Sequence, residues 1–502
     1  MTGLAITQPL HRAARETPDR IATVDSTRQR TWREIASRCR RVAAVLTDLG
    51  VVPGDRVALL APNGDLFVDF LFGSLWAGAV ACPVNTRWTA GEIAYALADC
   101  GANVLIVDPG FRSMLADIRR EAPDLREVVM AGPVFEQLIA AAGELDEHLR
   151  HGDDLAMILY TGGTTGRSKG VMLSHRALMA YALCLAGAGD AAPGECMLHT
   201  APLFHVGAIS GFLACLLGGG RHVFVPAFDA EAVMAVIAGQ QVTDLFLVPT
   251  MLQAVLDHPR FGEHDLTSAR RIYYGAAPMP PALMDRAIAA MPRVGFVQGY
   301  GMTETAGSIS LLKPADHRDP ARLRSAGRAV MAIEARIVDA DDREVQVGEI
   351  GEIVARGEAV MTGYWNRPEE TAEALRGGWM HTGDVGRMDA DGYIHVVDRL
   401  KDMIISGGEN VYSVEVEAVL ANHPGVSQCA VVGRPDSRWG ERVHAVVVLK
   451  PGLETSADDI VAYSRSVLAS YKCPRSIEFR TEMPLSAAGK IVKAELRADF
   501  PA

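Results

Sequence analysis

The sequence predicts an α/β fold with more than one hydrophobic core. Strand-like apolar runs, such as residues 56–60 and 103–107, alternate with helical patterns, which is typical of βαβ units and a largely parallel sheet. A chain of 502 residues exceeds what one core supports and suggests about two to four domains. Its 49% hydrophobic and 22% charged residues indicate a compact soluble protein.

The bulk composition argues against several function classes. A net charge of -12 disfavours a nucleic-acid partner. The eight cysteines are scattered without metal-ligand spacing, so we expect reduced thiols of a cytoplasmic protein, with no disulfide framework and no zinc site. Residues 1–20 lack the continuous apolar core of a signal peptide. The longest apolar runs are too short to span a bilayer, although peripheral membrane contact stays open.

The sequence predicts both ends of a helix between Thr31 and Gly50. Thr31-Trp32-Arg33-Glu34 has the pattern of a capping box, and apolar residues then recur at steps of three and four until Gly50. Strands are expected at residues 56–60, 103–107, 155–159, 244–248, 271–274 and 295–298.

A loop rich in glycine and threonine follows the third of these strands. It reads Tyr160-Thr161-Gly162-Gly163-Thr164-Thr165-Gly166-Arg167-Ser168-Lys169-Gly170. Glycines let backbone N–H groups approach an anion closely, while threonine hydroxyls and Lys169 add donors and positive charge. Lys169 precedes a glycine instead of Ser or Thr, which excludes a Walker A loop. We predict a triphosphate-binding loop of another type; glycine and threonine alone would equally suit a flexible surface loop.

Two later strands open onto further glycine-containing segments. Residues 271–274 lead into Gly275-Ala276-Ala277, and residues 295–298 lead into Gly299-Tyr300-Gly301-Met302-Thr303-Glu304. Loops at the carboxyl ends of sheet strands are where open α/β folds bind ligands. Between the phosphate loop and these strands lies Phe204-His205-Val206-Gly207-Ala208, whose histidine, taken alone, is more often a core residue than a catalyst.

The sequence pattern changes after residue 332, where short strand-like segments replace the alternation of strands and helices. Short alternating strands at residues 333–338, 348–355 and 393–397 predict a small antiparallel β-subdomain, in which Asp384 follows a Thr-Gly pair. Beyond it we expect a helix capped by Ser413, with Val416, Val419 and Leu420 on its inner face. Strands at residues 429–432 and 444–449 then belong to a separate α+β unit of about 100 residues, with a domain boundary at Asp402.

Five stretches, in this order, resemble signatures of the adenylate-forming superfamily of acyl- and aryl-CoA synthetases, luciferases and peptide-synthetase adenylation domains. They are the loop from Thr161 to Lys169, the segment from Tyr300 to Glu304, Thr382-Gly383-Asp384, the run from Arg399 to Asn410, and Gly489-Lys490. The resemblance covers nearly the whole chain. It implies a large N-terminal domain of two α/β subdomains plus a β-subdomain, residues 1–401, and a small mobile C-terminal α+β domain, residues 402–502, hinged at Asp402.

The resemblance also implies the reaction and its cofactors. A carboxylate attacks the α-phosphate of ATP, giving an acyl-adenylate and pyrophosphate, and the thiol of CoA then displaces AMP. ATP, Mg²⁺ and coenzyme A are the implied cofactors, a small carboxylic acid is the substrate, and a monomer or homodimer is expected. Bacterial fatty-acyl-CoA, feruloyl- or 4-coumaroyl-CoA and chlorobenzoyl-CoA ligases are the members that it resembles.

Residue roles follow from matching positions. The resemblance implies that the phosphates are held by Thr161, Gly162, Gly163, Thr164, Thr165, Gly166 and Lys169, and that Glu304 binds Mg²⁺ with Thr161 as a second candidate. It implies that adenine and the α-phosphate are enclosed by Gly275, Ala276, Ala277, Gln298, Gly299, Tyr300, Gly301, Met302 and Thr303, and that the ribose is held by Asp384 and Arg399. It also implies that Lys490 bridges the carboxylate and the α-phosphate, and that CoA is contacted by Arg87, Trp439, Tyr471 and Arg475. Cys473 replaces a basic residue of a relative, Gly162 the usual serine and Ser168 the usual proline.

One segment limits the classes of acid that the chain could use as a substrate. Amino-acid-activating relatives carry an aspartate in the segment equivalent to residues 204–208, and this chain has none, which disfavours an amino acid. The implied acyl pocket consists of Cys184, His205, Val206, Gly207, Phe246, Ala306 and Gly307. It suits an aryl or cinnamic acid, or a medium- to long-chain fatty acid. Alternatives are an enzyme that loads a carrier protein, a silent nucleotide-binding scaffold, and a luciferase-type oxygenase.

Overall fold

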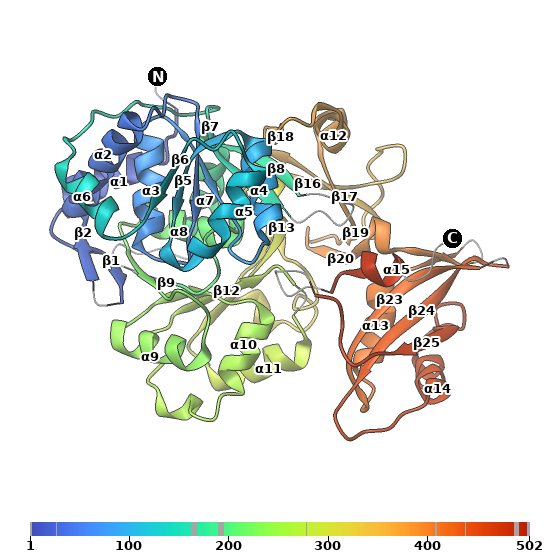
Figure 1. Cartoon of the computed structure of the whole chain (residues 1–502). Coiled ribbons are helices and arrows are strands. Elements are labelled where there is room, and N and C mark those ends of the chain that lie inside the picture. The colour runs from blue at the N-terminus through green and yellow to red at the C-terminus, as the bar shows by residue number, and fades with distance from the viewer. Residues whose placement is uncertain are drawn as a thin grey trace. The chain divides into compact units, whose positions relative to one another are not determined.

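The structure of the protein is a computed structural model. It describes residues 3–26, 28–161, 168–188, 195–277, 279–406, 409–436, 438–485 and 491–498. The chain divides into two compact units, and Figure 1 shows both, coloured along the chain. Of the described residues, the first unit contains the chain up to Thr161, Ser168–Ala335 and Ala355–Met380, whereas the second contains Arg336–Val354 and the chain from His381 onward.

A seven-stranded sheet in the first unit carries the phosphate loop. Its strand order is β18-β8-β7-β4-β3-β5-β6, with β7, β4, β3, β5 and β6 parallel and β8 and β18 added antiparallel at one edge. Ile93, Leu97 and Ile118 pack against the buried sheet residues Leu60 and Leu105. The elements are β3 (Arg56–Leu60), β4 (Val80–Pro83), β5 (Ala102–Val107), β6 (Glu127–Met130), β7 (Leu155–Thr161), β8 (Lys169–Ser174), β18 (Gly363–Tyr364), α2 (Trp32–Asp48), α3 (Asp65–Trp76), α4 (Ala90–Cys100), α5 (Leu115–Glu121), α6 (Pro133–Ala141) and α12 (Pro368–Ala374).

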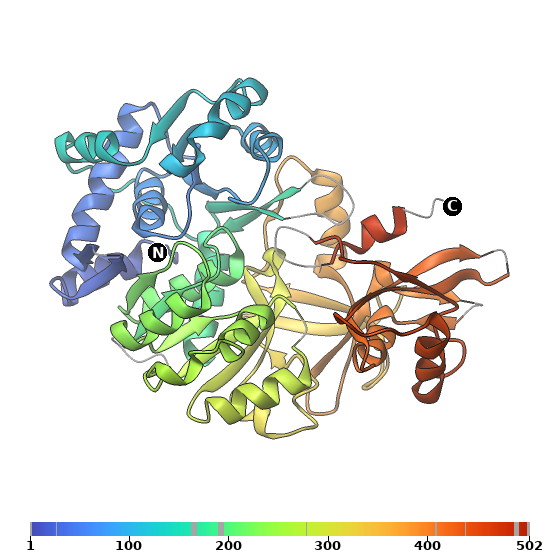
Figure 2. The ribbon, with the colours of Figure 1, turned by 60° about the horizontal axis from the view of Figure 1, so that its bottom comes forward.

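A nine-stranded sheet completes the first unit. Its order is β15-β14-β13-β12-β11-β9-β10-β1-β2, with six central parallel strands and antiparallel strands at both edges. Figures 1 and 2 show α9, α10 and α11 grouped together beside it. The elements are β1 (Ile21–Asp25), β2 (Arg28–Thr31), β9 (Cys196–His199), β10 (Arg221–Phe224), β11 (Asp244–Phe246), β12 (Arg271–Gly275), β13 (Gly295–Met302), β14 (Gly307–Leu312), β15 (Arg328–Ala329), α1 (Gln8–Glu16), α7 (His175–Ala188), α8 (Val206–Leu217), α9 (Ala230–Gln240), α10 (Pro249–Leu256), α11 (Pro281–Ala290) and the short 3-10 helix η3 (Thr303–Thr305).

The second unit contains two smaller sheets. One has the order β16-β17-β19-β20, and the other has the order β22-β21-β24-β23 with β25 parallel to β24. Val416 and Leu420 of α13 pack on Val431 and Val443 in the core of the second sheet. The elements are β16 (Ile333–Val338), β17 (Gly351–Gly357), β19 (Met380–Met388), β20 (Ile394–Arg399), η6 (Leu400–Asp402), β21 (Ile404–Ser406), β22 (Glu409–Val411), β23 (Val426–Asp436), β24 (Gly440–Leu449), β25 (Ser476–Phe479), α13 (Ser413–Ala421), α14 (Ala457–Val467) and α15 (Lys493–Ala498).

The predicted α/β class and the predicted helix that begins after Thr31 are confirmed. Thr31 is the N-cap of α2, its hydroxyl accepts from the Glu34 N–H, and the Glu34 carboxylate accepts from the Thr31 N–H at 2.7 Å. The parallel centres of both large sheets agree with the predicted alternation, and the antiparallel edges were not anticipated. The domain boundary at Asp402 stays a prediction.

The predicted Ser413 cap is wrong. Ser413 is the first residue of α13, and its N-cap, Tyr412, makes no side-chain cap. Asp398, from the preceding strand β20, caps the helix instead because its carboxylate accepts hydrogen bonds from the N–H groups of Ser413 and Val414. Negative charge at a helix N-terminus is favourable, so a carboxylate from outside the helix replaces the expected serine.

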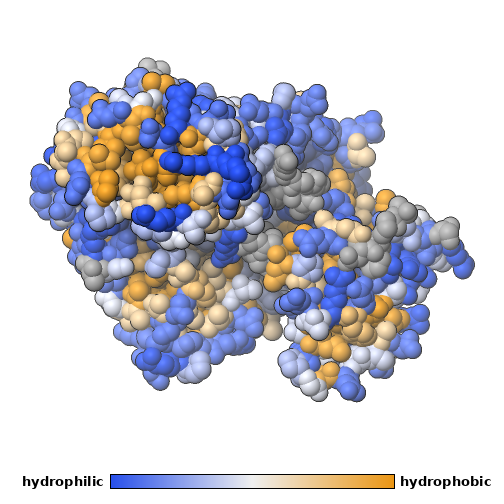
Figure 3. Space-filling model, in the orientation of Figure 1, coloured by the Kyte–Doolittle hydropathy of each residue, from blue (hydrophilic) through white to orange (hydrophobic). Residues whose placement is uncertain are grey.

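Apolar residues gather on part of the molecular surface. Figure 3 shows an orange area on the first unit, bordered by hydrophilic residues. The exposed large apolar side chains include Val134 and Leu138, one turn apart on α6. No helix in the described parts of the chain is both long enough and apolar enough to cross a membrane.

A pair of buried histidines makes stability depend on pH. His199 Nε2 and His222 Nδ1 are 3.0 Å apart, and burial lowers the pKa of His222 to about 3. An unfolded histidine titrates near 6.5. Between these values the unfolded chain binds more protons than the folded chain, so the free energy of unfolding falls as pH falls below about 6.5.

We expect the His222→Phe variant to lose less of its thermal stability between pH 7 and pH 5 than the wild type does. Differential scanning fluorimetry at both pH values measures this difference, and the partly exposed His258 provides a matched His258→Phe control. An equal drop in melting temperature for His222→Phe and the wild type would contradict the assignment.

Candidate functional site

The phosphate loop connects two antiparallel strands. Thr161 ends β7, Lys169 begins β8, and their Cα atoms are partners in the strand register. Strand β8 was not among the predicted strands. Gly162, Gly163, Thr164, Thr165 and Gly166 lie outside the described residues, as does Lys490. Thr161 and Lys169, the two predicted site residues that flank the loop, therefore lie opposite each other on paired strands.

Lys169 and Glu304 are linked by one aromatic residue. Glu304 lies in η3, directly after β13, and is buried. Its Oε1 atom accepts a hydrogen bond of 2.8 Å from the Tyr364 hydroxyl. The Lys169 ammonium group lies 4.8 Å from the centroid of the Tyr364 ring and forms an ion pair with Glu370. The structure thus brings the predicted phosphate lysine to the ring of Tyr364 and the predicted metal carboxylate to its hydroxyl group.

The segments predicted to enclose the nucleotide lie on adjacent strands. Gly275 ends β12 and pairs in register with Gly299 of the parallel strand β13. A Cβ atom at Gly275 would collide with the Gly299 carbonyl oxygen, so this close approach requires glycine. Ala276 has φ of +64° and is exposed with Ala277 just beyond the strand end. Gln298, Gly299, Tyr300, Gly301 and Met302 follow along β13, and Thr303 opens η3.

Most of the predicted acyl-pocket residues meet around the start of α8. His205 is the N-cap of α8, and its ring centroid lies 4.6 Å from that of Phe204. Gly207 abuts Phe246 of β11, since a Cβ atom there would lie 3.6 Å from Phe246 Cζ. Val206 is the first residue of α8 and its carbonyl accepts from the Ser210 hydroxyl at 2.7 Å.

The other side of this region is formed by β14 and α7. Ala306 O accepts a hydrogen bond of 2.9 Å from Ser210 Oγ. Gly307, with φ of +148°, lies against the Tyr181 ring and leaves no room for a Cβ atom. Cys184 follows Tyr181 by one turn of α7 and is buried, and burial raises the pKa of its thiol. The backbone groups beside its thiol are those of Met331 and Ala332.

Asp384 and Arg399 form an ion pair within the second unit. They are register partners on β19 and β20, and Arg399 Nε lies 3.1 Å from Asp384 Oδ1. Asp384 is buried, while the Arg399 side chain is half exposed. Asp384 and the preceding Gly383, which has a φ of +67°, both lie within strand β19.

The predicted hinge residue also has a partner in its own unit. Asp402, the last residue of η6, accepts a hydrogen bond of 2.6 Å from the Arg497 guanidinium of α15. It is buried. This contact links the start of the predicted C-terminal domain to its last helix.

Two of the predicted CoA residues stack on each other. The Arg475 guanidinium lies 4.4 Å from the Trp439 ring centroid. Tyr471 lies near Lys472 instead, at 5.8 Å from ring centroid to ammonium nitrogen. Arg87 belongs to the first unit and is exposed. The structure therefore groups Trp439 with Arg475 only.

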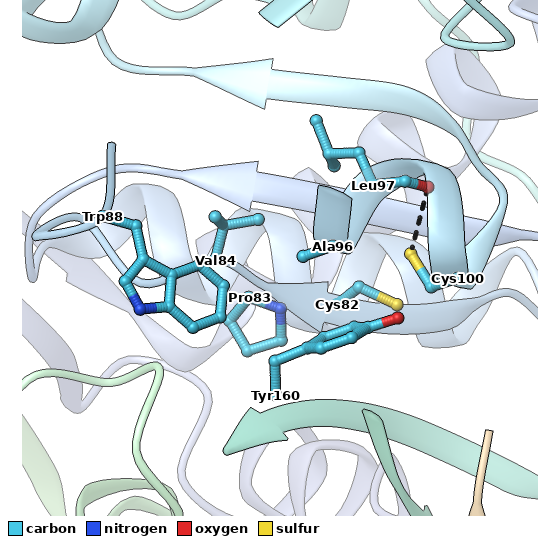
Figure 4. A pocket seen from close by; sticks show the side chains of 8 residues that line it. All are labelled: Cys82, Pro83, Val84, Trp88, Ala96, Leu97, Cys100 and Tyr160. Carbon is cyan, nitrogen blue, oxygen red and sulfur yellow. Dashed lines mark hydrogen bonds between the residues drawn. The ribbon is translucent and has the colours of Figure 1, made fainter. Parts of the chain in front are cut away.

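The sequence reading missed the residues that hold these groups in place. Tyr364, Tyr181 and Asn63 were not predicted, because each acts on residues distant in sequence, as in the Tyr364–Glu304 contact across 60 residues. A small apolar cavity beside the phosphate loop was also missed. Figure 4 shows its lining: Cys82, Pro83, Val84, Trp88, Ala96, Leu97, Cys100 and Tyr160.

The fold is an α/β architecture with two large mixed sheets, in which a glycine- and threonine-rich segment joins the antiparallel strands β7 and β8. Comparison with known families is more specific. Residues 10–365 match the AMP-binding enzyme family and residues 415–490 match the AMP-binding enzyme C-terminal domain. The chain belongs to the AMP-binding enzyme family, which confirms the resemblance drawn from the five motifs.

Several known proteins are similar to this chain over nearly their whole length. A feruloyl-CoA synthase from Amycolatopsis sp is 43% identical, with 97% of this chain and 98% of that protein covered. A fatty acid–[acyl-carrier-protein] ligase, ScoC, from Streptomyces coeruleorubidus is 36% identical, with coverages of 97% and 95%. The solved structure of a Mycobacterium tuberculosis fatty acyl CoA synthetase superposes with a TM-score of 0.81 at 36% identity, covering 99% of this chain and 98% of that one.

Proposed function

We propose that this chain is an AMP-forming acid:CoA ligase that activates an aryl, cinnamic or fatty acid as an acyl-adenylate and then transfers the acyl group to CoA. The class follows from the family and from relatives named as CoA ligases. The observation that carries the proposal is the placement of Lys169 and Glu304 around Tyr364 at the base of the phosphate loop. This arrangement offers positive charge and a carboxylate at one place, as phosphoryl chemistry requires.

The residues present fit an ATP–Mg²⁺ complex. Mg²⁺ prefers oxygen ligands and is usually held by one or two carboxylates together with substrate phosphates. Among the described residues no group of three His, Cys, Asp or Glu side chains could hold a metal ion by itself, so phosphate oxygens would complete a site at Glu304, with the Thr161 hydroxyl as the second candidate. When bound, Mg²⁺ would neutralise charge on the phosphates. Lys169 would hold the β- and γ-phosphates.

The remaining roles are proposed on the same basis. Asp384 and Arg399 would bind the ribose, and Lys490 would bridge the carboxylate and the α-phosphate. Trp439 and Arg475, whose stacking supports an adenine or phosphate contact, would contact CoA with Arg87 and Tyr471. Asp402 would act as the hinge between the two half-reactions. A cytoplasmic monomer or homodimer stays a prediction.

The pocket around the start of α8 supports an apolar acid. Its described residues are mainly small or aromatic, with Gly207 against Phe246 and Gly307 against Tyr181. None of the predicted pocket residues is acidic, so nothing there would pair with the ammonium group of an amino acid. Flat aryl and linear fatty chains are therefore the two substrate classes to compare.

The test is the release of AMP and pyrophosphate from ATP, with and without CoA, across acids from acetate and palmitate to benzoate, coumarate and ferulate. CoA-dependent AMP release concentrated on aryl or fatty acids is the expected result. Pyrophosphate release that ignores CoA would favour a carrier-protein ligase, the activity named for ScoC. Absence of release with every acid would contradict the proposal.

Asn63 holds the chain that leads into the acyl pocket. Its Nδ2 atom donates to the carbonyls of His199 and Ala201 at 3.2 and 2.9 Å, and its Oδ1 atom accepts from the Leu203 N–H at 2.9 Å. The Asn63→Ala variant would leave these buried backbone groups without a partner and let the His205 segment shift. We expect KM for the acid to rise about tenfold.

Steady-state kinetics with ATP and acid varied in turn measures this effect. KM for ATP should stay within about twofold, since the hydrogen bonds of Asn63 among the described residues go to His199, Ala201 and Leu203, which are not predicted nucleotide residues. The exposed Asn422, which bonds only locally to Ala418 O on α13, provides the Asn422→Ala control. Equal increases in both KM values for Asn63→Ala would contradict a role specific to the acyl pocket.

A further inference from the structure

A short segment that follows β17 in the chain is tied to the strand that begins at Lys169. Its strand β18, Gly363–Tyr364, pairs antiparallel with β8, where Tyr364 is the register partner of Val171. The Trp365 N–H donates to Gly170 O at 2.8 Å, directly after Lys169. Backbone pairing therefore fixes the position of Tyr364 along β8.

The same segment is tied to Glu304 at two points. The Met361 N–H donates to the Glu304 carbonyl at 2.8 Å, and the Tyr364 hydroxyl donates to the Glu304 carboxylate, also at 2.8 Å. Tyr364 is 8% exposed and Glu304 is 6% exposed. The contact between these two side chains is therefore shielded from solvent.

The segment also reaches the other end of the phosphate loop through Asp99. The Asp99 carboxylate accepts from the Tyr160 hydroxyl at 2.7 Å and from Arg367 at 3.1 Å, while the Asp99 carbonyl accepts from Trp365 Nε1 at 2.9 Å. Tyr160, which lines the cavity in Figure 4 together with Trp88, immediately precedes Thr161. Both ends of the loop are thus held by residues 361–367.

We propose that Tyr364 is a positioning residue for the metal–triphosphate complex, orienting the Glu304 carboxylate through its hydroxyl and supporting the Lys169 ammonium group on its ring face. The inference rests on the proposed function, in which Glu304 binds Mg²⁺ and Lys169 binds phosphate. A hydrogen bond to a metal-binding carboxylate fixes the direction of its free electron pairs. A ring face attracts a cation without competing for the donors that a phosphate needs.

Two variants test the role of the Tyr364 hydroxyl and the role of its ring separately. Tyr364→Phe removes only the hydroxyl that bonds to Glu304, and Tyr364→Leu also removes the ring beneath Lys169. Binding of a non-hydrolysable ATP analogue to the full-length protein is measured by isothermal titration calorimetry, once with Mg²⁺ and once with EDTA. Tyr463→Phe on α14 is the matched tyrosine control, and melting temperatures report whether each variant is folded.

For Tyr364→Phe we expect the Kd of the analogue to rise about tenfold with Mg²⁺ and to stay within about twofold of the wild type in EDTA. For Tyr364→Leu we expect an additional increase of about threefold in both conditions, since Lys169 loses its ring partner. Activity follows the same order, with half-saturation by Mg²⁺ in pyrophosphate release shifted to higher concentration in Tyr364→Phe.

Equal weakening of Tyr364→Phe with Mg²⁺ and in EDTA would overturn the proposal, because the tyrosine would then only hold the loop. An unchanged Kd in Tyr364→Phe would overturn it as well. A wild type that fails to bind the analogue would overturn the proposed nucleotide site itself, and this outcome is distinct from a wild type that binds normally beside an unaffected variant.

Discussion

Replacing Glu304 with glutamine is expected to lower the rate of adenylate formation by about 10²- to 10³-fold. Glutamine has the same size and its carbonyl oxygen still accepts the hydrogen bond from Tyr364, so the packing of this buried position is kept. The substitution removes the negative charge that would hold Mg²⁺ against the phosphates. Acid-dependent pyrophosphate release at saturating ATP and Mg²⁺ measures the rate.

A glutamate outside the proposed site provides the matched control. Glu334 pairs with Arg356 at the surface, with 45% of its side chain exposed. Glu334→Gln should retain the wild-type rate, since charge at an exposed pair contributes little. Similar rates for Glu304→Gln and the wild type, with both proteins folded by melting temperature, would remove Glu304 from the proposed metal site.

The second large effect concerns stability. Replacing Asp69 with alanine is expected to lower the free energy of unfolding by about 3–5 kcal/mol. Asp69 is 1% exposed on α3 and accepts hydrogen bonds of 2.8 Å from Arg38 Nε at both carboxylate oxygens. Arg30, also buried, lies 3.3 Å away. Without Asp69 these guanidinium groups keep fewer counter-charges in an apolar surrounding.

An exposed pair of the same chemistry isolates the contribution of burial. Asp19 and Arg33 are 3.0 Å apart, with 81% and 65% of their side chains exposed, so Asp19→Ala should cost no more than about 1 kcal/mol. Thermal unfolding of both variants at one pH compares them. Equal shifts in melting temperature would contradict the claim that burial makes the Asp69 network important.

Much of the candidate site could be predicted from local sequence. The glycine- and threonine-rich segment and the Gly299 to Glu304 segment are recognisable from a few neighbouring residues, whereas the close approach of Gly275 to Gly299 comes from the pairing of two strands. The Thr31 to Glu34 capping box is similar, because both of its hydrogen bonds form within one helical turn. The predicted Ser413 cap was wrong because Asp398 of β20 accepts from the N–H groups of Ser413 and Val414, and the helix begins at Ser413 itself.

The sequence by itself determined the α/β class and the family, since alternation and motif order are readable along the chain, while phosphate binding by the glycine- and threonine-rich loop stays a prediction. Only the tertiary structure decided which side chains hold the loop and the carboxylate. Pairing of β18 with β8 places Tyr364 between Lys169 and Glu304, and Asn63 reaches three backbone groups more than 100 positions away. The physical reason is that local patterns record backbone preference and burial, whereas strand pairing across distant segments sets which side chains become neighbours.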